Sequence, residues 1–199
     1  RMTHKISHRG PDELRVSQAN VPAVMAHCRL SIIGLENGTQ PIYNGENALV
    51  ANGEIYNYAD LRAILGESAF ETESDSETIL HLFRAGEPRW ATKLDGMFAF
   101  VLATPERIIA ARDPLGIKPL FMARIGDGLA FASELKAYDG LGLSAVETID
   151  PGAMFDSIDG FREWYRMPQG AAELEAGEDA EPIWRELRLV LEAAVRKWM

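Results

Sequence analysis

Arg29 and Asp75 are charged residues in segments where a charge needs a partner. Arg29 lies within the apolar run VMAHCRLSII (24–33), and a buried guanidinium without an anion is strongly disfavoured. Its partner is either an internal carboxylate or a ligand carboxylate, which arginine can bind through two parallel hydrogen bonds. Asp75 falls in the first turn of a predicted helix, where it either caps the helix or binds the amino group of a ligand.

Asn52-Gly53 closes the apolar run at 48–51 and is followed by a carboxylate, Glu54. On its own the dipeptide predicts a tight turn, because both residues tolerate a positive φ. The same dipeptide offers a side-chain amide beside an unhindered backbone N–H. Two donors aimed at one point can stabilise the oxyanion of a tetrahedral intermediate. The pair is therefore either a turn or an oxyanion hole.

Metal-binding and nucleotide-binding motifs do not occur in the sequence. The four histidines, at positions 4, 8, 27 and 81, form no His-Glu-x-x-His pattern, and the chain has no Cys-x-x-Cys. It also has neither a P-loop nor a G-x-G-x-x-G segment. We therefore expect no metal site and no cofactor in this part of the protein.

Short apolar runs separated by turn signals predict strands, and amphipathic runs between them predict helices. Helices are expected over 58–65 and about 75–85, the second opened by a capping box between Ser74 and Glu77. Strands are expected at 24–33, 48–51, 97–104 and 107–112, and in a hairpin around Gly126-Asp127-Gly128. Antiparallel sheets with a few helices outside them indicate an α+β sandwich.

The composition changes near residue 170. Residues 171–181 are acidic and contain no aromatic side chain, as expected of a solvated linker. Beyond Pro182, apolar residues recur at helical spacing. We divide the chain into a main domain at 1–166, an acidic linker at 167–181 and a helix at 182–199 that begins a second domain.

The composition excludes several classes of protein. With 199 residues, 47% hydrophobic and 25% charged, the chain is typical of a soluble globular protein. No apolar run approaches the roughly 18 residues of a membrane-spanning helix, so we expect no membrane partner. A net charge of −10 argues against general binding of nucleic acid. A single cysteine, Cys28, excludes an internal disulfide and fits the cytoplasm.

Several segments of the sequence occur in one order that resembles the amidotransferase domain of glutamine-hydrolysing asparagine synthetases. They are HRGPDE (8–13), RLSII (29–33), QPIYN (40–44), NGEIYNYADLR (52–62), SDSET (74–78), LDGMFAFVLAT (94–104), ARDPLGIKPLF (111–121) and FASELKA (131–137). The resemblance covers about residues 1–166, and the helix at 182–199 looks like the opening helix of the family's synthetase domain. It implies a class II glutamine amidotransferase with the N-terminal-nucleophile hydrolase fold. That fold is a four-layer αββα sandwich of two antiparallel sheets.

The resemblance also assigns roles to the residues introduced above. Asn52, through its side chain, and Gly53, through its backbone N–H, would form the oxyanion hole for hydrolysis of the glutamine carboxamide. Oppositely charged groups a few ångströms apart suit a zwitterion. The residues implied to bind glutamine are Arg29 on the carboxylate, Glu54 and Asp75 on the ammonium, and the backbone of Leu30, Ser31, Ile32 and Ile33.

In this family the nucleophile is an N-terminal cysteine whose own α-amine is the general base. The sequence begins at Arg1, so we expect the nucleophile to be absent from it. Cys28 lies mid-strand without an α-amine beside its thiol and is not expected to replace it. The partners implied are L-glutamine and a synthetase domain of the same polypeptide, which uses ATP and Mg²⁺ to amidate aspartate to asparagine. The resemblance leaves room for a homodimer.

Two other interpretations stay open. Relatives with the same two-domain plan, such as β-lactam synthetases or amidotransferases of polysaccharide loci, differ mainly in the second domain. A catalytically inactive glutamine-binding domain would keep the binding residues without the nucleophile. The amidotransferase residues alone do not separate these from an asparagine synthetase.

We predict that the purified 199-residue chain releases no ammonia from glutamine, because its first residue is Arg1 and not a cysteine that carries the free α-amine. The measurement is a glutaminase assay that detects ammonia in the presence and absence of the chain. Ammonia above the blank would contradict the prediction.

Overall fold

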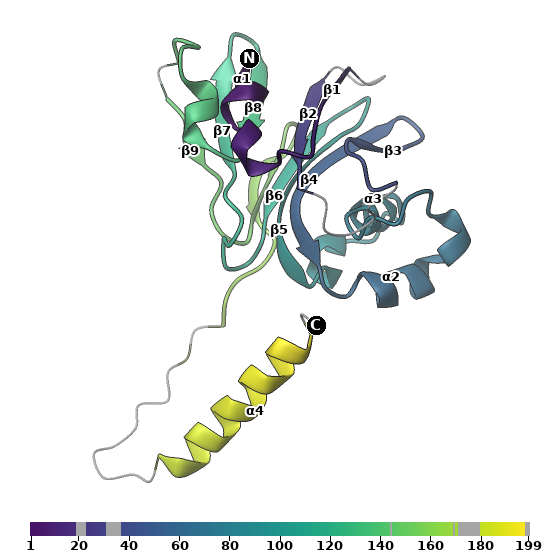
Figure 1. Ribbon diagram of the computed structural model, residues 1–199, viewed down its shortest axis with the longest axis vertical. Helices are drawn as coiled ribbons and strands as arrows, with labels where there is room; N and C mark the ends of the chain where they lie inside the picture. Colours follow the sequence, from purple (N-terminus) through teal and green to yellow (C-terminus); the bar gives the residue numbers. More distant parts are fainter. Residues whose placement is uncertain (19–22, 31–36, 144, 169, 171–179, 198–199) are drawn as a thin grey trace. The chain divides into compact units, whose positions relative to one another are not determined.

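The computed structural model describes residues 1–18, 23–30, 37–143, 145–168, 170 and 180–197 (Figure 1). The chain forms two compact units, Arg1–Arg166 and Met167–Met199. In the second unit a helix, α4, spans Glu181–Lys197, where the apolar spacing predicts one. None of the helices in the described ranges is both long enough and apolar enough to cross a membrane.

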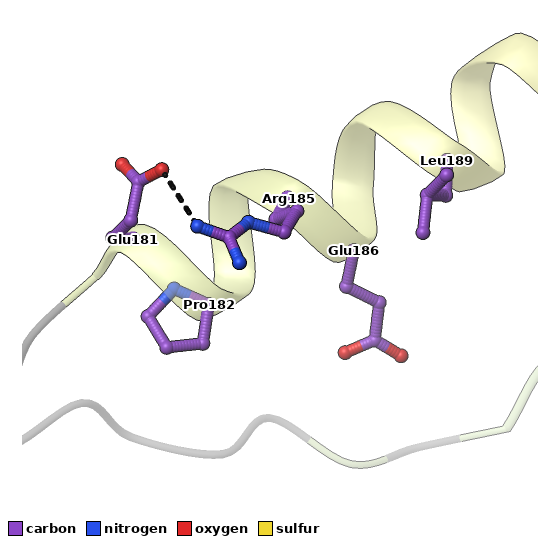
Figure 2. Close-up of a pocket in the computed structure, with 5 residues that line it drawn as sticks. All are labelled: Glu181, Pro182, Arg185, Glu186 and Leu189. Atoms are coloured by element: carbon purple, nitrogen blue, oxygen red, sulfur yellow. Dashed lines mark ion pairs between the residues drawn. The ribbon is translucent and has the colours of Figure 1, made fainter.

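Figure 2 shows a hollow on one side of α4. Glu181 and Arg185, one helical turn apart, form an ion pair at 3.5 Å, and both side chains are exposed. An exposed pair with this spacing contributes only about 0.3–0.5 kcal/mol. The described residues that line the hollow all belong to this helix: Glu181, Pro182, Arg185, Glu186 and Leu189.

The first unit is built around a six-stranded antiparallel sheet with the strand order β11-β10-β6-β5-β4-β3. Its strands are β3 (Ile42–Asn44), β4 (Asn47–Ile55), β5 (Gly96–Ala103), β6 (Ile108–Arg112), β10 (Ala153–Asp156) and β11 (Gly160–Glu163). Two smaller antiparallel sheets accompany it. They consist of β1 (Glu13–Gln18) with β2 (Val24–Arg29), and of β8 (Gly128–Ala132), β7 (Phe121–Ile125) and β9 (Glu147–Thr148).

Helices lie on both sides of these sheets. The α-helices of the first unit are α1 (Met2–Lys5), α2 (Tyr58–Leu65) and α3 (Glu77–Arg84). Short 3₁₀ helices span Ser7–Arg9, Glu67–Ala69, Trp90–Lys93 and Leu135–Tyr138. Helices α2 and α3 cover one face of the six-stranded sheet, and the smaller sheets lie against the other face (Figure 1).

Strand alternation lets β5 serve two cores. Phe98, Phe100 and Leu102 pack in one cluster with apolar residues of α2 and α3. Ala99 and Val101 lie on the opposite face and pack against residues of the smaller sheets. Because successive side chains of a strand point to opposite faces, a strand buried on both faces is apolar throughout.

The outer face of β7 and β8 is covered in turn by the N-terminal segment. Met2 and Ile6 pack with Ala130 and Ala132 of β8 and with Tyr138 of the 3₁₀ helix at Leu135–Tyr138. The layer order is therefore helix, sheet, sheet, helix. The predicted α+β class is confirmed, as is the predicted four-layer order.

Among the described residues, the second sheet layer consists of two pieces. Met25 of β2 packs on Ala48 and Ala103, whereas Met122 of β7 packs on Ala99. Both pieces lie on the same face of the large sheet but share no described ladder.

The predicted helix at 58–65 is confirmed as α2, and the hairpin around Gly126-Asp127-Gly128 is confirmed as β7 and β8. Helix α3 begins at Glu77, two residues later than expected. The predicted capping box is wrong, because the Glu77 carboxylate accepts hydrogen bonds from the backbone of Glu71 and Thr72.

We predict that Phe100→Ala lowers the free energy of unfolding by about 3–5 kcal/mol, because it removes a fully buried aromatic ring. The Phe100 ring packs 5.9 Å from the rings of Trp90 and Phe98, so both neighbours would face the resulting cavity. Urea denaturation measures the change. The control is Ile64→Ala on α2, an exposed position where a change within about 0.5 kcal/mol is expected. Equal losses in the two variants would contradict the prediction.

Candidate functional site

A cavity of about 310 Å³ is lined by β2, by the C-terminal half of β4 and by the turn that precedes α3. These elements belong to different parts of the sequence and to two different sheets. The predicted residues Ser31, Ile32 and Ile33 lie outside the described residues. The structure places all the other predicted binding residues in the cavity wall: Arg29, Leu30, Asn52, Gly53, Glu54 and Asp75.

The alternation of β4 explains why Asn52 and Glu54 reach this cavity. Val50, two residues before Asn52, packs in the cluster that contains Met25 of β2. Side chains two apart on a strand share a face. Asn52 and Glu54 therefore lie on the face of the large sheet that meets the smaller sheets.

Asn52-Gly53 is not a turn, because β4 continues through it to Ile55. Gly53 pairs with Phe98 of β5 and has a φ of 145°. A Cβ on Gly53 would lie 2.0 Å from the backbone oxygen of Met97. The glycine is required by its positive φ and by the close approach of β5.

The side chain of Asn52 holds an unsatisfied donor. Its Nδ2 is buried and has no hydrogen-bond partner among the described residues. A buried donor without a partner costs about 1–3 kcal/mol. An oxygen atom of a bound molecule in the cavity would satisfy it.

Arg29 is buried on β2, directly opposite Glu13 of β1. Its Nη1 lies 3.9 Å from Oε2 of Glu13, a half-exposed residue. This contact is long compared with the about 2.7–2.9 Å of a close charge-assisted hydrogen bond. Arg29 thus makes an internal ion pair and also lines the cavity.

Asp75 is buried, and its Oδ2 accepts a hydrogen bond of 2.6 Å from the amide of Ile55. The interpretation as a helix cap is wrong, because α3 begins at Glu77 and its N-cap is Ser76, without a side-chain cap. Burial raises the pKa of the Asp75 carboxyl above its ordinary value, and hydrogen bonds from the backbone of Ile55 and Ser76 oppose the rise. The charge of Glu54 adds to it. A cation bound beside both acids would reverse this effect.

Gln40 and His27 also line the cavity and were not predicted from the sequence. Strand β3 begins only at Ile42, so the edge of β4 at Ala51 lies beyond the β3 ladder. The Gln40 Oε1 accepts a 2.6 Å hydrogen bond from the Ala51 amide. Burial lowers the pKa of His27, and a hydrogen bond with the Ala51 backbone opposes this. Both side chains thus support the residue that precedes Asn52.

Lys118 and Arg9 add positive charge to the cavity wall. Lys118 ends a loop organised by Asp113, whose buried carboxylate accepts hydrogen bonds from the amides of Leu115, Ile117 and Lys118. Both cations were missed as site residues, although they lie within the segments ARDPLGIKPLF and HRGPDE, which could have identified them.

The single thiol, Cys28, also contributes to the wall. Burial raises its pKa above the ordinary value, and the charge of Arg9 opposes the rise. Its sulfur donates a hydrogen bond of 3.6 Å to the carbonyl of Thr3. A thiol with a raised pKa is a weak nucleophile at neutral pH. Within the described part of the chain, no three His, Cys, Asp or Glu side chains gather as metal ligands would.

The cavity therefore combines a buried guanidinium, two nearby carboxylates and an unsatisfied amide donor. Such a wall can hold a small molecule that carries both charges and a polar oxygen.

A family model described as "Glutamine amidotransferase domain" matches residues 1–158. The probable asparagine synthetase [glutamine-hydrolyzing] of Schizosaccharomyces pombe is 38% identical over 205 residues, covering 98% of this chain and 36% of the relative. The asparagine synthetase [glutamine-hydrolyzing] of Zea mays is 39% identical over 173 residues, covering 84% of this chain and 29% of the relative. The chain thus spans about a third of the length of these curated relatives.

Among solved structures, the chain is similar to the glutamine phosphoribosylpyrophosphate amidotransferase from B. subtilis in complex with ADP and GMP. The TM-score is 0.66 and the identity 26%, over 82% of this chain and 45% of that chain. A structure titled as the allosteric regulatory enzyme of purine biosynthesis matches with the same TM-score and 25% identity, over 82% and 46% of the two chains. These neighbours share the N-terminal-nucleophile hydrolase fold that the sequence predicts.

We predict that Asp75→Asn raises the free energy of unfolding at pH 7. Because its pKa is raised, Asp75 binds a proton more tightly in the folded state than in the unfolded state. The stability that this proton contributes is lost as pH rises from the ordinary aspartate pKa, about 3.9, through the raised pKa of the folded state. An uncharged side chain removes that loss while it keeps an acceptor for the Ile55 amide. Urea denaturation at pH 4 and pH 7 measures the difference.

Asp156→Asn is the matched control, because it should change stability in the opposite direction. Burial would raise the pKa of Asp156, but hydrogen bonds from the Ile158 amide and from Arg107 outweigh burial and lower it. The ionised Asp156 carboxylate therefore stabilises the folded state above the ordinary aspartate pKa, and this stabilisation is lost as pH falls through the lowered pKa. Destabilisation of both variants at pH 7 would refute the assignment for Asp75.

Proposed function

The chain belongs to the glutamine amidotransferase domain family, and on this basis we propose that residues 1–166 bind L-glutamine as the amidotransferase part of a glutamine-hydrolysing asparagine synthetase. The observation that carries the proposal is the gathering of Arg29, Asn52, Glu54 and Asp75 around one cavity from three separate segments. Each residue alone has a structural explanation. Binding of a free amino acid with a side-chain amide would use all four together, because its carboxylate, its ammonium and its amide each need a partner.

The two charged ends of glutamine would bind to groups of opposite sign. The guanidinium of Arg29 holds the α-carboxylate, which can approach more closely than Glu13 does at 3.9 Å. The α-ammonium binds between Glu54 and Asp75. Burial and the charge of Glu54 raise the pKa of Asp75, and the positive charge of an ammonium at this position would oppose that rise.

The carboxamide of glutamine would lie beside Asn52 and Gly53. Nδ2 of Asn52 donates to the carbonyl oxygen and later to the oxyanion, and the Gly53 N–H is the second donor. The unsatisfied state of this buried Nδ2 among the described residues supports the assignment. Donors that are fixed before the reaction stabilise a developing oxyanion without reorganisation. The strand position of both residues provides that rigidity.

The reaction of the whole protein is also part of the proposal. The curated relatives are named glutamine-hydrolyzing asparagine synthetases and are about three times as long as this chain. We propose that the nucleophilic cysteine and the synthetase domain lie outside residues 1–199. The sequence contains no P-loop, so ATP and Mg²⁺, which activate aspartate for amidation, would bind in the synthetase domain. A reducing cytoplasm would suit the single thiol, Cys28.

We predict that isothermal titration of the 199-residue chain with L-glutamine gives one binding site, and that Arg29→Ala and Asp75→Ala each weaken it. The expected loss is roughly 1.5–3 kcal/mol for each variant, the scale of a hydrogen bond to a charged group. The controls are Arg124→Ala and Asp127→Ala, which remove the same charges from exposed positions of the β7–β8 hairpin, outside the cavity wall. Unchanged affinity in either cavity variant would remove that residue from the site.

A further inference from the structure

Between α2 and α3 the chain forms a loop, residues 66–76, that carries Asp75 into the cavity wall. Two buried residues of opposite charge reach this loop from the flanking helices. Arg62 of α2 is 8% exposed, and Glu77 of α3 is 0% exposed. Each contacts a different residue: Arg62 pairs with Glu67, and Glu77 lies 3.3 Å from His81.

Arg62 binds the carbonyl side of the loop. Its Nη2 donates to the carbonyl oxygen of Thr72 and, at 3.3 Å, to that of Ser74. Its Nη1 donates to the Glu67 carboxylate at 3.0 Å. The guanidinium carbon lies 4.3 Å from the centroid of the Phe70 ring, in a cation–π contact. A planar guanidinium can satisfy several acceptors at once, which a lysine ammonium does not reproduce.

Glu77 binds the amide side of the same loop. Its carboxylate accepts hydrogen bonds from the amide of Glu71 at 2.8 Å, the amide of Thr72 at 2.7 Å and the hydroxyl of Thr72 at 2.6 Å. Burial would raise the pKa of Glu77, but these hydrogen bonds outweigh it and lower the pKa, so the carboxylate is charged at neutral pH. The Thr72 hydroxyl also accepts a 3.1 Å hydrogen bond from the Ser74 amide.

We propose that Arg62 and Glu77 are positioning residues, which hold Thr72 by its carbonyl and its amide and thereby fix the carboxylate of Asp75 in the cavity. We call Arg62, Thr72 and Glu77 the Thr72 clamp. The role in ligand binding rests on the proposed function, since Asp75 is assigned there to the ammonium of glutamine. The clamp acts through Ser74, the residue before Asp75, which both the Arg62 guanidinium and the Thr72 hydroxyl bind.

The clamp affects the contribution that the α-ammonium of the ligand makes to affinity. Asp75 faces the α-ammonium, whereas Arg29 and Asn52 face the carboxylate and the carboxamide. A loosened clamp therefore weakens binding only of ligands that carry the ammonium. This distinguishes positioning from a general loss of stability, which weakens binding of every ligand.

The test compares two ligands in the 199-residue chain by isothermal titration: L-glutamine, and glutaramic acid, which is glutamine without its α-amino group. Arg62→Met and Glu77→Gln are expected to weaken binding of L-glutamine by about tenfold, the scale of coupling within one hydrogen-bond network. Binding of glutaramic acid is expected to change less than about twofold. Arg124→Met, at an exposed position outside the cavity wall, is the control and should leave both affinities unchanged.

A double-mutant cycle connects the clamp to Asp75. In an Asp75→Asn background, Arg62→Met should cause no further loss of affinity for L-glutamine, because the group that it positions no longer carries a charge. Additive losses in the cycle, or equal losses for both ligands, would overturn the proposal. Glu77→Gln supports the same cycle if Arg62→Met does not fold.

The Ile55 amide gives a readout that needs no ligand. It donates to Asp75 Oδ2, so its hydrogen exchange reports directly on the position of that carboxylate. Arg62→Met and Glu77→Gln should accelerate exchange at Ile55 but not at Leu102, a fully buried residue of β5 that lies opposite Leu49 and Ile109. If the unmodified chain binds no glutamine, the proposed function fails, and unchanged exchange at Ile55 would separately refute the clamp.

Discussion

One hydrogen bond, from the amide of Ile55 to the carboxylate of Asp75, joins the last residue of β4 to the turn before α3. β4 carries Asn52 and Glu54, and the turn carries Asp75, so this bond sets the spacing between two parts of the cavity wall that are built by different elements. Burial of the acid opposes its ionisation. The structure thus holds a group in an unfavourable state at the place where a ligand would need it, as is common for functional sites.

The site begins where the regular hydrogen-bonding of the large sheet ends. Up to Leu49, β4 is paired on one side by β3, and its side chains alternate between two apolar cores. At Ala51 the amide is bound by the Gln40 side chain. One residue later, the alternation that packs Val50 against Met25 of β2 places Asn52 on the same face of the sheet. The first part of β4 therefore packs in the apolar cores, and the last part lines the cavity. The rigidity of the packed part supports the residues that line the cavity.

Features that depend on neighbouring residues could be predicted from the sequence, and features that depend on distant contacts could not. Helix α2 and the β7–β8 hairpin follow from apolar spacing and turn residues, and the structure has them as expected. β1 was not predicted, because its alternation is limited to Leu14 and Val16, and both of these side chains are exposed. The turn interpretation of Asn52-Gly53 failed because the partner strand β5, more than 40 residues away, decides the local conformation.

The candidate site shows the same division. Charged or amide groups at unusual positions pointed to Arg29, Asn52 and Asp75. Gln40 and Lys118 have no unusual feature apart from lying in the segments QPIYN and ARDPLGIKPLF, and only the fold shows that the Gln40 side chain binds the Ala51 amide beside the cavity. The close approach of β5 at Gly53 constrains this position in evolution, whatever its role in catalysis. Any side chain there would push β5 away and disturb both cores, so selection for folding alone retains the glycine. Lineages that have lost catalysis would keep it as faithfully as active ones, and its persistence among descendants says nothing about chemistry.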